Sequence, residues 1–109
     1  MRFTALLLLP LTLVAAQPQP PIPADRWSLP ADETGLPGEG ALRRYDGYVR
    51  RWHDARQEWA GRVAADQGAV VFLGDSITQG WGNDFKGAFA GMKLANRGIG
   101  GDTTRGMLI

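Results

Sequence analysis

The sequence predicts an α/β fold with parallel strands, and three stretches of the chain lead to this prediction. Residues 69–73 are five apolar residues in a row that end at Gly74-Asp75-Ser76, which is typical of a strand buried on both faces that ends at a turn. Residues 41–66 carry apolar side chains at helical spacing, and residues 92–96 read as a second short strand. A helix that begins after each strand would give the alternation of strands and helices that is typical of a parallel sheet.

The composition is that of one small globular domain. The chain has 109 residues, of which 44% are hydrophobic and 21% are charged. Twelve Lys and Arg residues nearly balance eleven Asp and Glu residues, so charge gives no reason to expect a nucleic-acid partner or an anionic membrane surface. The absence of cysteine excludes disulfides and cysteine-bound metal.

Residues 1–16 are expected to be a secretory signal peptide. A short basic start is followed by an apolar stretch, and the small residues at 14–16 suit a signal peptidase. The alternative is a membrane anchor, but the apolar run is shorter than the about 20 residues that span a bilayer. We therefore expect cleavage after Ala16, a secreted or periplasmic location, and no stable membrane span afterwards.

Residues 17–40 are expected to form a proline-rich, extended arm. They contain six prolines and three glycines, and proline disfavours both helix interiors and strand ladders. A turn is expected at residues 35–38. Trp27 and Leu29 could fasten the arm to the domain, although a floppy spacer is slightly favoured.

The helix expected over residues 41–66 is amphipathic. Its apolar positions are Leu42, Tyr45, Val49, Trp52, Trp59 and Val63. Arginines lie mainly between these positions and alternate with acidic residues, so a solvated face is favoured over a nucleic-acid surface. Gly68 is a natural stop before the strand.

His53 is the only histidine in the chain. Pairing it with Ser76 is tempting, but no acidic residue is obviously placed to orient it. A lone histidine on a helix is usually a surface or boundary residue, and catalytic triads are defined by geometry rather than by order in the sequence. We therefore do not expect His53 to be catalytic.

Ser76 is the candidate nucleophile. It follows the apolar strand at the carboxyl end, where open α/β sheets bind ligands, and free N–H groups in the first turn of the next helix can hold an oxyanion. Gly74 permits close approach of chain or substrate, and Asp75 can accept a hydrogen bond that sets the turn. A serine hydroxyl also needs a base to take its proton.

Residues 81–91 are expected to connect the two strands. Phe85 and Phe89 stand at helical spacing and are expected to anchor this segment to the core, while Gly82-Asn83-Asp84 is interpreted as a loop or a helix N-cap.

A glycine-rich turn follows the second strand. Asp102 is a plausible N-cap for a helix that starts at residues 103–104, and the glycines before it leave backbone N–H groups accessible to an anion. Taken alone, the glycines favour a simple tight turn. If the two strands are parallel neighbours, their turns face one crevice, and the serine hydroxyl and a glycine amide converge on one substrate oxygen.

Together, these two turns resemble the SGNH hydrolase (GDSL esterase/lipase) superfamily, and especially its platelet-activating-factor acetylhydrolase-like subgroup. Residues 70–81 look like the block that holds the nucleophilic serine, and residues 96–104 look like the block that supplies an oxyanion glycine. The resemblance implies a three-layer α/β/α sandwich with a flavodoxin-like sheet of about five parallel strands. It also implies that residues 41–109 are the N-terminal part of such a domain.

The resemblance implies that Ser76 is the nucleophile and that the amides of Ser76 and Gly101 hold the oxyanion, with Gly74, Asp75 and Asp102 in support. The family's Gly-x-Asn-Asp and Asp-x-x-His motifs, which supply an oxyanion asparagine and the catalytic base, have no counterpart. The segment at residues 82–84 lacks the spacer residue and precedes the second block, so it is not assigned to the former.

Two functions follow as hypotheses. The first is a secreted serine esterase that cleaves short acyl esters, such as acetyl esters, of carbohydrate or lipid, with neither metal nor cofactor, and that is inactive as this fragment. The alternative is a non-catalytic secreted module that binds carbohydrate or an anion. The usual nucleotide-binding glycine motifs are absent, which disfavours a nucleotide ligand.

Overall fold

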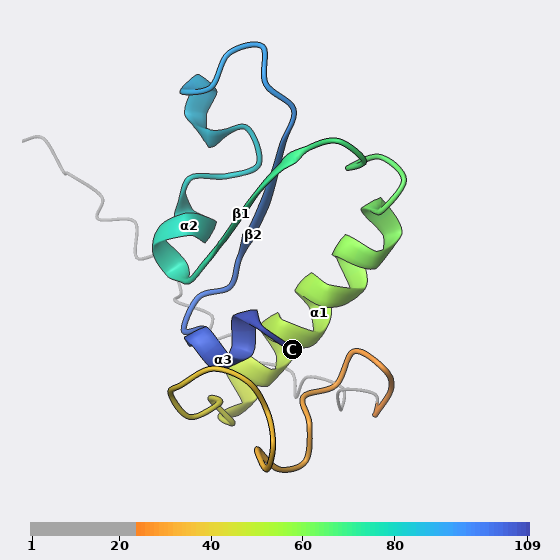
Figure 1. Cartoon of the computed structure of the whole chain (residues 1–109), viewed down its shortest axis with the longest axis vertical. Coiled ribbons are helices and arrows are strands. Elements are labelled where there is room, and N and C mark those ends of the chain that lie inside the picture. Colours follow the sequence, from red (N-terminus) through yellow and green to blue (C-terminus); the bar gives the residue numbers. More distant parts are fainter. Residues whose placement is uncertain (1–23) are drawn as a thin grey trace, which may run out of the picture.

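The computed structural model describes residues 24–109, so the expected signal peptide and the start of the arm lie outside the described residues. The elements in chain order are α1 (Asp46–Arg62), β1 (Val70–Gly74), α2 (Ser76–Gly80), the 3₁₀ turn η1 (Phe85–Gly87), β2 (Leu94–Gly98) and α3 (Thr104–Met107). The two strands run side by side in the middle of the molecule, with α1 on one side and α2 and η1 on the other (Figure 1).

The two strands form a parallel sheet, as the sequence predicts. The register runs from Val70 opposite Leu94 to Gly74 opposite Gly98, and the connection between the strands passes through α2 and η1. The second strand begins two residues later than expected, because the amide of Met92 donates to the carbonyl of Phe89 within a turn. The described residues therefore form a small mixed α/β unit, while the sandwich of about five strands stays a proposal.

The first strand is more exposed than its apolar sequence predicts. Val70, Val71 and Leu73 are 44%, 53% and 57% exposed, so the expected burial on both faces is wrong for this unit. The reason is that, among the helices of residues 24–109, only α2 packs closely on β1, so much of both faces of this strand stays uncovered. On β2, by contrast, Ala95 is only 2% exposed.

Helix α1 is shorter than the predicted range of 41–66. Its buried side chains are Tyr48, Trp52 and His53, of which Tyr48 and His53 are absent from the predicted apolar stripe. Tyr45 and Val63 are largely exposed because they lie just outside the two ends of the helix. The amphipathic helix is thus confirmed, but its ends and part of its buried face differ.

The core joins the arm, α1 and the residues that follow β2. Tyr48, Trp52 and Ile99 form its centre, and four partly buried residues pack around them: Leu29, Ala55, Trp59 and Ile109. Leu29 therefore fastens the arm to the domain, which was the less favoured of the two expectations. The expectation of a floppy spacer is wrong for this part of the arm.

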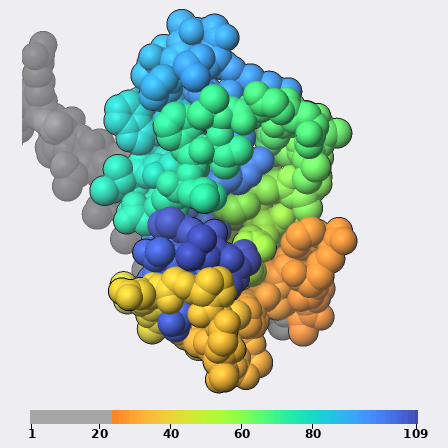
Figure 2. All heavy atoms as spheres, viewed as in Figure 1, coloured from red at the N-terminus to blue at the C-terminus, as the bar shows by residue number. Residues whose placement is uncertain are grey.

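A second attachment holds the arm against α3. Arg105 pairs with Glu33 at 2.5 Å and also donates to the carbonyl of Gly38 at 3.1 Å. The backbone amide of Arg105 donates to the carbonyl of Glu39. In Figure 2 the gold arm residues lie directly against the dark blue residues of α3. The arm therefore supports the helix that follows the glycine-rich turn.

Candidate active site

Ser76 occupies the position that the sequence predicts, directly after β1 and at the first residue of α2. Asp75 caps this helix, because its Oδ1 accepts a hydrogen bond of 2.9 Å from the amide of Ile77. The predicted role of Asp75 in setting the turn is thus confirmed. Ser76 is exposed, and the amide of a first helical residue has no acceptor within its own helix.

Close packing explains the glycines at the ends of both strands. A Cβ on Gly98 would overlap the backbone of α2, with atoms of Asp75, Thr78 and Gln79 all within 3 Å. A Cβ on Gly74 would collide with the side chain of Thr78. The close approach expected at Gly74 is therefore made by the chain itself. As a result, α2 rests directly on the carboxyl ends of both strands.

The two predicted turns come together in space. The Cβ of Ser76 lies 3.7 Å from the position that a Cβ on Gly100 would take. The amide of Gly100 donates to Oε1 of Gln79 at 2.9 Å, so this amide is already used inside the protein. Gly101 has a φ of +90°, which favours glycine, and no hydrogen bond within residues 24–109 uses its amide. The structure thus leaves the amide of Gly101, unlike that of Gly100, without a hydrogen-bond partner among residues 24–109.

Three side chains beside this turn were not found by sequence reasoning. Nη2 of Arg51 donates to the carbonyl of Gly100 at 3.4 Å and to the hydroxyl of Tyr45 at 3.1 Å. That hydroxyl lies 3.1 Å from the position of a Cβ on Gly101. The third side chain is that of Gln79, which follows Ser76 by three residues on α2 and therefore lies on the same helical face. This spacing is visible in the sequence. The Tyr45 and Arg51 contacts join residues about 50 positions apart, so no local signal reveals them.

Asp102 does not cap α3, which corrects the sequence prediction. The cap is Thr103, whose Oγ1 accepts from the amide of Gly106 at 3.3 Å. Oδ1 of Asp102 instead accepts from the hydroxyl of Tyr48 at 2.7 Å and from the amide of Thr103 at 2.9 Å. Asp102 is turned away from the cap because a buried donor on α1 competes for its carboxylate. Burial, together with this hydrogen bond, raises the pKa of Tyr48 above its usual value.

His53 is buried between two carboxylates, contrary to the expectation of a surface or boundary residue without acidic neighbours. Its Nδ1 lies 3.1 Å from Oδ1 of Asp54, and its Nε2 lies 3.3 Å from Oδ2 of Asp25. Asp25 is 28 residues away in the sequence, which is why sequence reasoning missed it. Both ring nitrogens are therefore occupied by partners other than Ser76.

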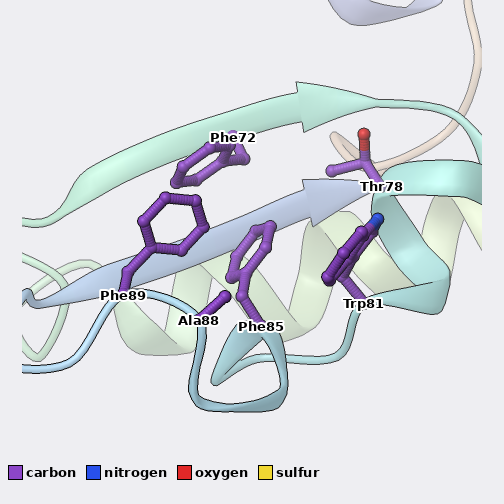
Figure 3. A pocket seen from close by; sticks show the side chains of 6 residues that line it. All are labelled: Phe72, Thr78, Trp81, Phe85, Ala88 and Phe89. Atoms are coloured by element: carbon purple, nitrogen blue, oxygen red, sulfur yellow. The ribbon is translucent and has the colours of Figure 1, made fainter.

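The larger cavity near α2 is aromatic. It has a volume of about 220 Å³ and is lined by Phe72, Thr78, Trp81, Phe85, Ala88 and Phe89, whose side chains gather over one face of the strands (Figure 3). The ring centroids of Phe72 and Phe85 are 4.4 Å apart, so the expectation that Phe85 anchors this segment is confirmed. Asp84 caps η1 by accepting from the amide of Lys86, which confirms the N-cap interpretation of this loop.

A smaller, polar cavity of about 140 Å³ is bordered by α1, α2 and β2. Gln79, Asn83, Asn96 and Gly98 line it together with residues 55, 58 and 59 of α1. Ser76 lines neither cavity, so in this unit the candidate nucleophile faces the surface beside the Gly100–Gly101 turn. Gln79 is thus shared between the polar cavity and that turn.

The part of the chain that the structure covers contains no group of three or more His, Cys, Asp or Glu residues that could hold a metal ion. Between residues 24 and 109 no helix has the length and apolar character needed to cross a membrane.

No family model, curated protein or solved structure matches the chain. The relation to the SGNH hydrolases therefore stays a prediction that depends on the two motifs.

Proposed function

We propose that Ser76 is the nucleophile of a secreted serine esterase of the SGNH type, which removes short acyl groups such as acetyl from carbohydrate or lipid. One observation carries this proposal: the Ser76 turn and the Gly100–Gly101 turn are in contact at the carboxyl ends of two parallel strands. Open α/β sheets bind their ligands at such an edge.

The proposed reaction begins when Oγ of Ser76 attacks the ester carbonyl. The carbonyl oxygen becomes an oxyanion, and the amides of Ser76 and Gly101 donate hydrogen bonds to it. A base must accept the proton of Ser76, and the alcohol then leaves with a proton. His53 is held by Asp25 and Asp54, so we propose that the base lies outside residues 24–109.

The alternative is a secreted module that binds a carbohydrate or an anion without catalysis. The observation that favours it is the guanidinium of Arg51, which lies beside the carbonyl of Gly100 and adds positive charge close to the amide of Gly101. In this reading Ser76 is a hydrogen-bonding group rather than a nucleophile.

The first test is the coding sequence that follows the codon of Ile109. The esterase proposal expects an in-frame Gly-x-Asn-Asp motif and a later Asp-x-x-His motif within about 100 codons, since a sheet of five strands needs roughly this much more chain. A reading frame that continues without either motif would favour the binding module.

The second test is labelling of the chain, together with any in-frame continuation, by a fluorophosphonate. Ser76 and Ser28 are the only serines of residues 1–109, which provides a matched pair of variants. We expect Ser76→Ala to abolish labelling within these residues and to abolish ester turnover, and Ser28→Ala to retain both. Turnover that survives Ser76→Ala would refute the esterase proposal.

A further inference from the structure

Both contacts of His53 can be hydrogen bonds at the same time only when its ring carries two protons. The side chain is 4% exposed, and each ring nitrogen faces a carboxylate oxygen, from Asp54 at 3.1 Å and from Asp25 at 3.3 Å. Ionised carboxylates only accept hydrogen bonds, so both ring nitrogens must donate. Only the imidazolium form of histidine has two N–H groups, whereas the neutral ring has one donor and one acceptor.

The two carboxylates come from different parts of the chain. Asp54 is the next residue on α1, so it stays beside the ring whatever the arm does, whereas Asp25 belongs to the arm. When the ring is neutral, one nitrogen lone pair faces a carboxylate oxygen and is repelled by it. Water screens part of this repulsion, because the side chains of Asp25 and Asp54 are 36% and 65% exposed. Of the two contacts, the one between His53 and Asp25 joins the arm to α1, so its loss is what would release the arm.

We propose that His53 is a pH-sensitive clamp that holds the start of the described arm, residues 24–29, against α1 and releases it when the ring loses a proton. This inference does not depend on the proposed esterase function, since neither Asp25 nor His53 belongs to the candidate active site. It gives a role to the only histidine of the chain.

The direction of the switch follows from the charged groups around the ring. Asp54 on α1 and Asp25 on the arm face His53, and their hydrogen bonds raise its pKa above the usual 6.5, against the opposing effect of burial. The amide of Trp27, followed by His53, lowers the pKa of Asp25 below 3.8, and Arg26 adds a smaller contribution. Docking is therefore complete between about pH 4 and 6.5 and weakens as the pH rises through the raised pKa of His53.

The release is confined to the beginning of the arm. Further along, Glu33 pairs with Arg105 at 2.5 Å and accepts from the amide of Leu42 at 3.0 Å. Neither an arginine nor an ionised glutamate changes charge near neutral pH. The attachment at α3 therefore persists when the clamp at His53 opens. Leu29 lies between Asp25 and Glu33 in the sequence, and docking of the arm adds its side chain to the core.

The test is an NMR titration of the full chain. Because His53 is the only histidine, its ring nitrogens and Hε1 give unambiguous signals. We expect its midpoint to lie above 6.5, with the protonated ring carrying two N–H groups. Heteronuclear NOE values for residues 24–29 should be those of ordered backbone at pH 6 and should fall toward those of a flexible chain at pH 9.

Two variants provide the comparison. Asp25→Asn removes the charge of the arm partner, and we expect it to lower the His53 midpoint and to give residues 24–29 NOE values at pH 6 as low as those of the wild type at pH 9. Each unit by which the midpoint falls corresponds to an about tenfold weaker preference of the arm for the protonated ring. Asp32→Asn changes an arm aspartate that accepts only from the amide of Thr34 in the described residues, and it should leave both readouts unchanged.

The proposal is overturned if His53 titrates at or below 6.5 in the wild-type chain, or if residues 24–29 keep the same NOE values from pH 6 to pH 9. It is also overturned if Asp32→Asn shifts the His53 midpoint as much as Asp25→Asn does.

Discussion

The hydroxyl of Tyr48, a fully buried residue on α1, donates a hydrogen bond of 2.7 Å to Oδ1 of Asp102, which follows Gly101 in the turn after β2. The same carboxylate oxygen accepts from the amide of Thr103, and Gly106 packs tightly against it. This pair therefore ties the candidate oxyanion turn to the helix that precedes the sheet.

We expect Tyr48→Phe to lower the free energy of unfolding by about 2 kcal/mol, because a buried hydrogen bond to a charged acceptor is lost. Urea denaturation followed by circular dichroism measures this change. The matched control is Tyr45→Phe, since the hydroxyl of Tyr45 accepts from Arg51 and its side chain is 54% exposed. An equal cost for the two variants would contradict the importance assigned to the Tyr48–Asp102 pair.

A second prediction concerns the packing of α2 against the carboxyl ends of the two strands. A Cβ on Gly98 would overlap the backbone amide of Gln79, and backbone cannot move aside as a flexible side chain can. We expect Gly98→Ala to cost about 2 to 3 kcal/mol of unfolding free energy and to shift the amide signals of residues 75–80.

The control for this substitution is Gly61→Ala. Gly61 lies inside α1 and a Cβ there would meet nothing within 4 Å, so alanine should stabilise the protein by about 0.5 to 1 kcal/mol through its higher helix propensity. If both substitutions have the same sign, close packing at Gly98 is not the determining factor.

The third prediction concerns acid stability. Asp66, just after α1, pairs with Arg97 on β2 at 2.5 Å and with Arg62 at 3.1 Å. The hydrogen bond from Arg97, followed by that from Arg62, lowers the pKa of Asp66 below its usual 3.8. Its contribution to stability is thus complete above pH 3.8 and is lost as the pH falls through the lowered pKa of the folded state.

We therefore expect the urea midpoint of the wild-type chain to decrease between pH 5 and pH 2.5 more steeply than that of Asp66→Asn. Asp32→Asn alters an aspartate that forms no ion pair with any of residues 24–109, and it should retain the wild-type slope. Parallel slopes for wild type and Asp66→Asn would show that this pair does not link α1 to β2 in the expected way.

The fourth prediction is that the 109-residue chain hydrolyses p-nitrophenyl acetate roughly 10⁴-fold or more slowly than intact serine esterases do. The reason is that its one histidine is held by Asp25 and Asp54, so Ser76 lacks a base. A stopped assay with Ser76→Ala as the background measures the rate. A rate typical of an intact enzyme, or one that His53→Gln abolishes, would contradict this reading.

Local features of this chain follow its sequence more closely than long-range ones do. The structure confirms the strand that ends at Gly74 and the helix caps at Asp75 and Asp84. Each of these features depends on residues within a few positions of one another. The cap at Thr103 was misassigned to Asp102, because the choice between two adjacent caps depends on Tyr48, a partner 54 residues away.

By itself, the sequence determined that two short strands would each end in a turn able to present a serine or a glycine amide, since strand periodicity and turn chemistry act over a few residues. Only the tertiary structure decided that β1 would be exposed, that Gln79 would occupy the amide of Gly100 while leaving that of Gly101 free, and that His53 would sit between two carboxylates. Each of these outcomes depends on which distant segments pack together, and long-range packing is set by the whole chain rather than by neighbouring residues.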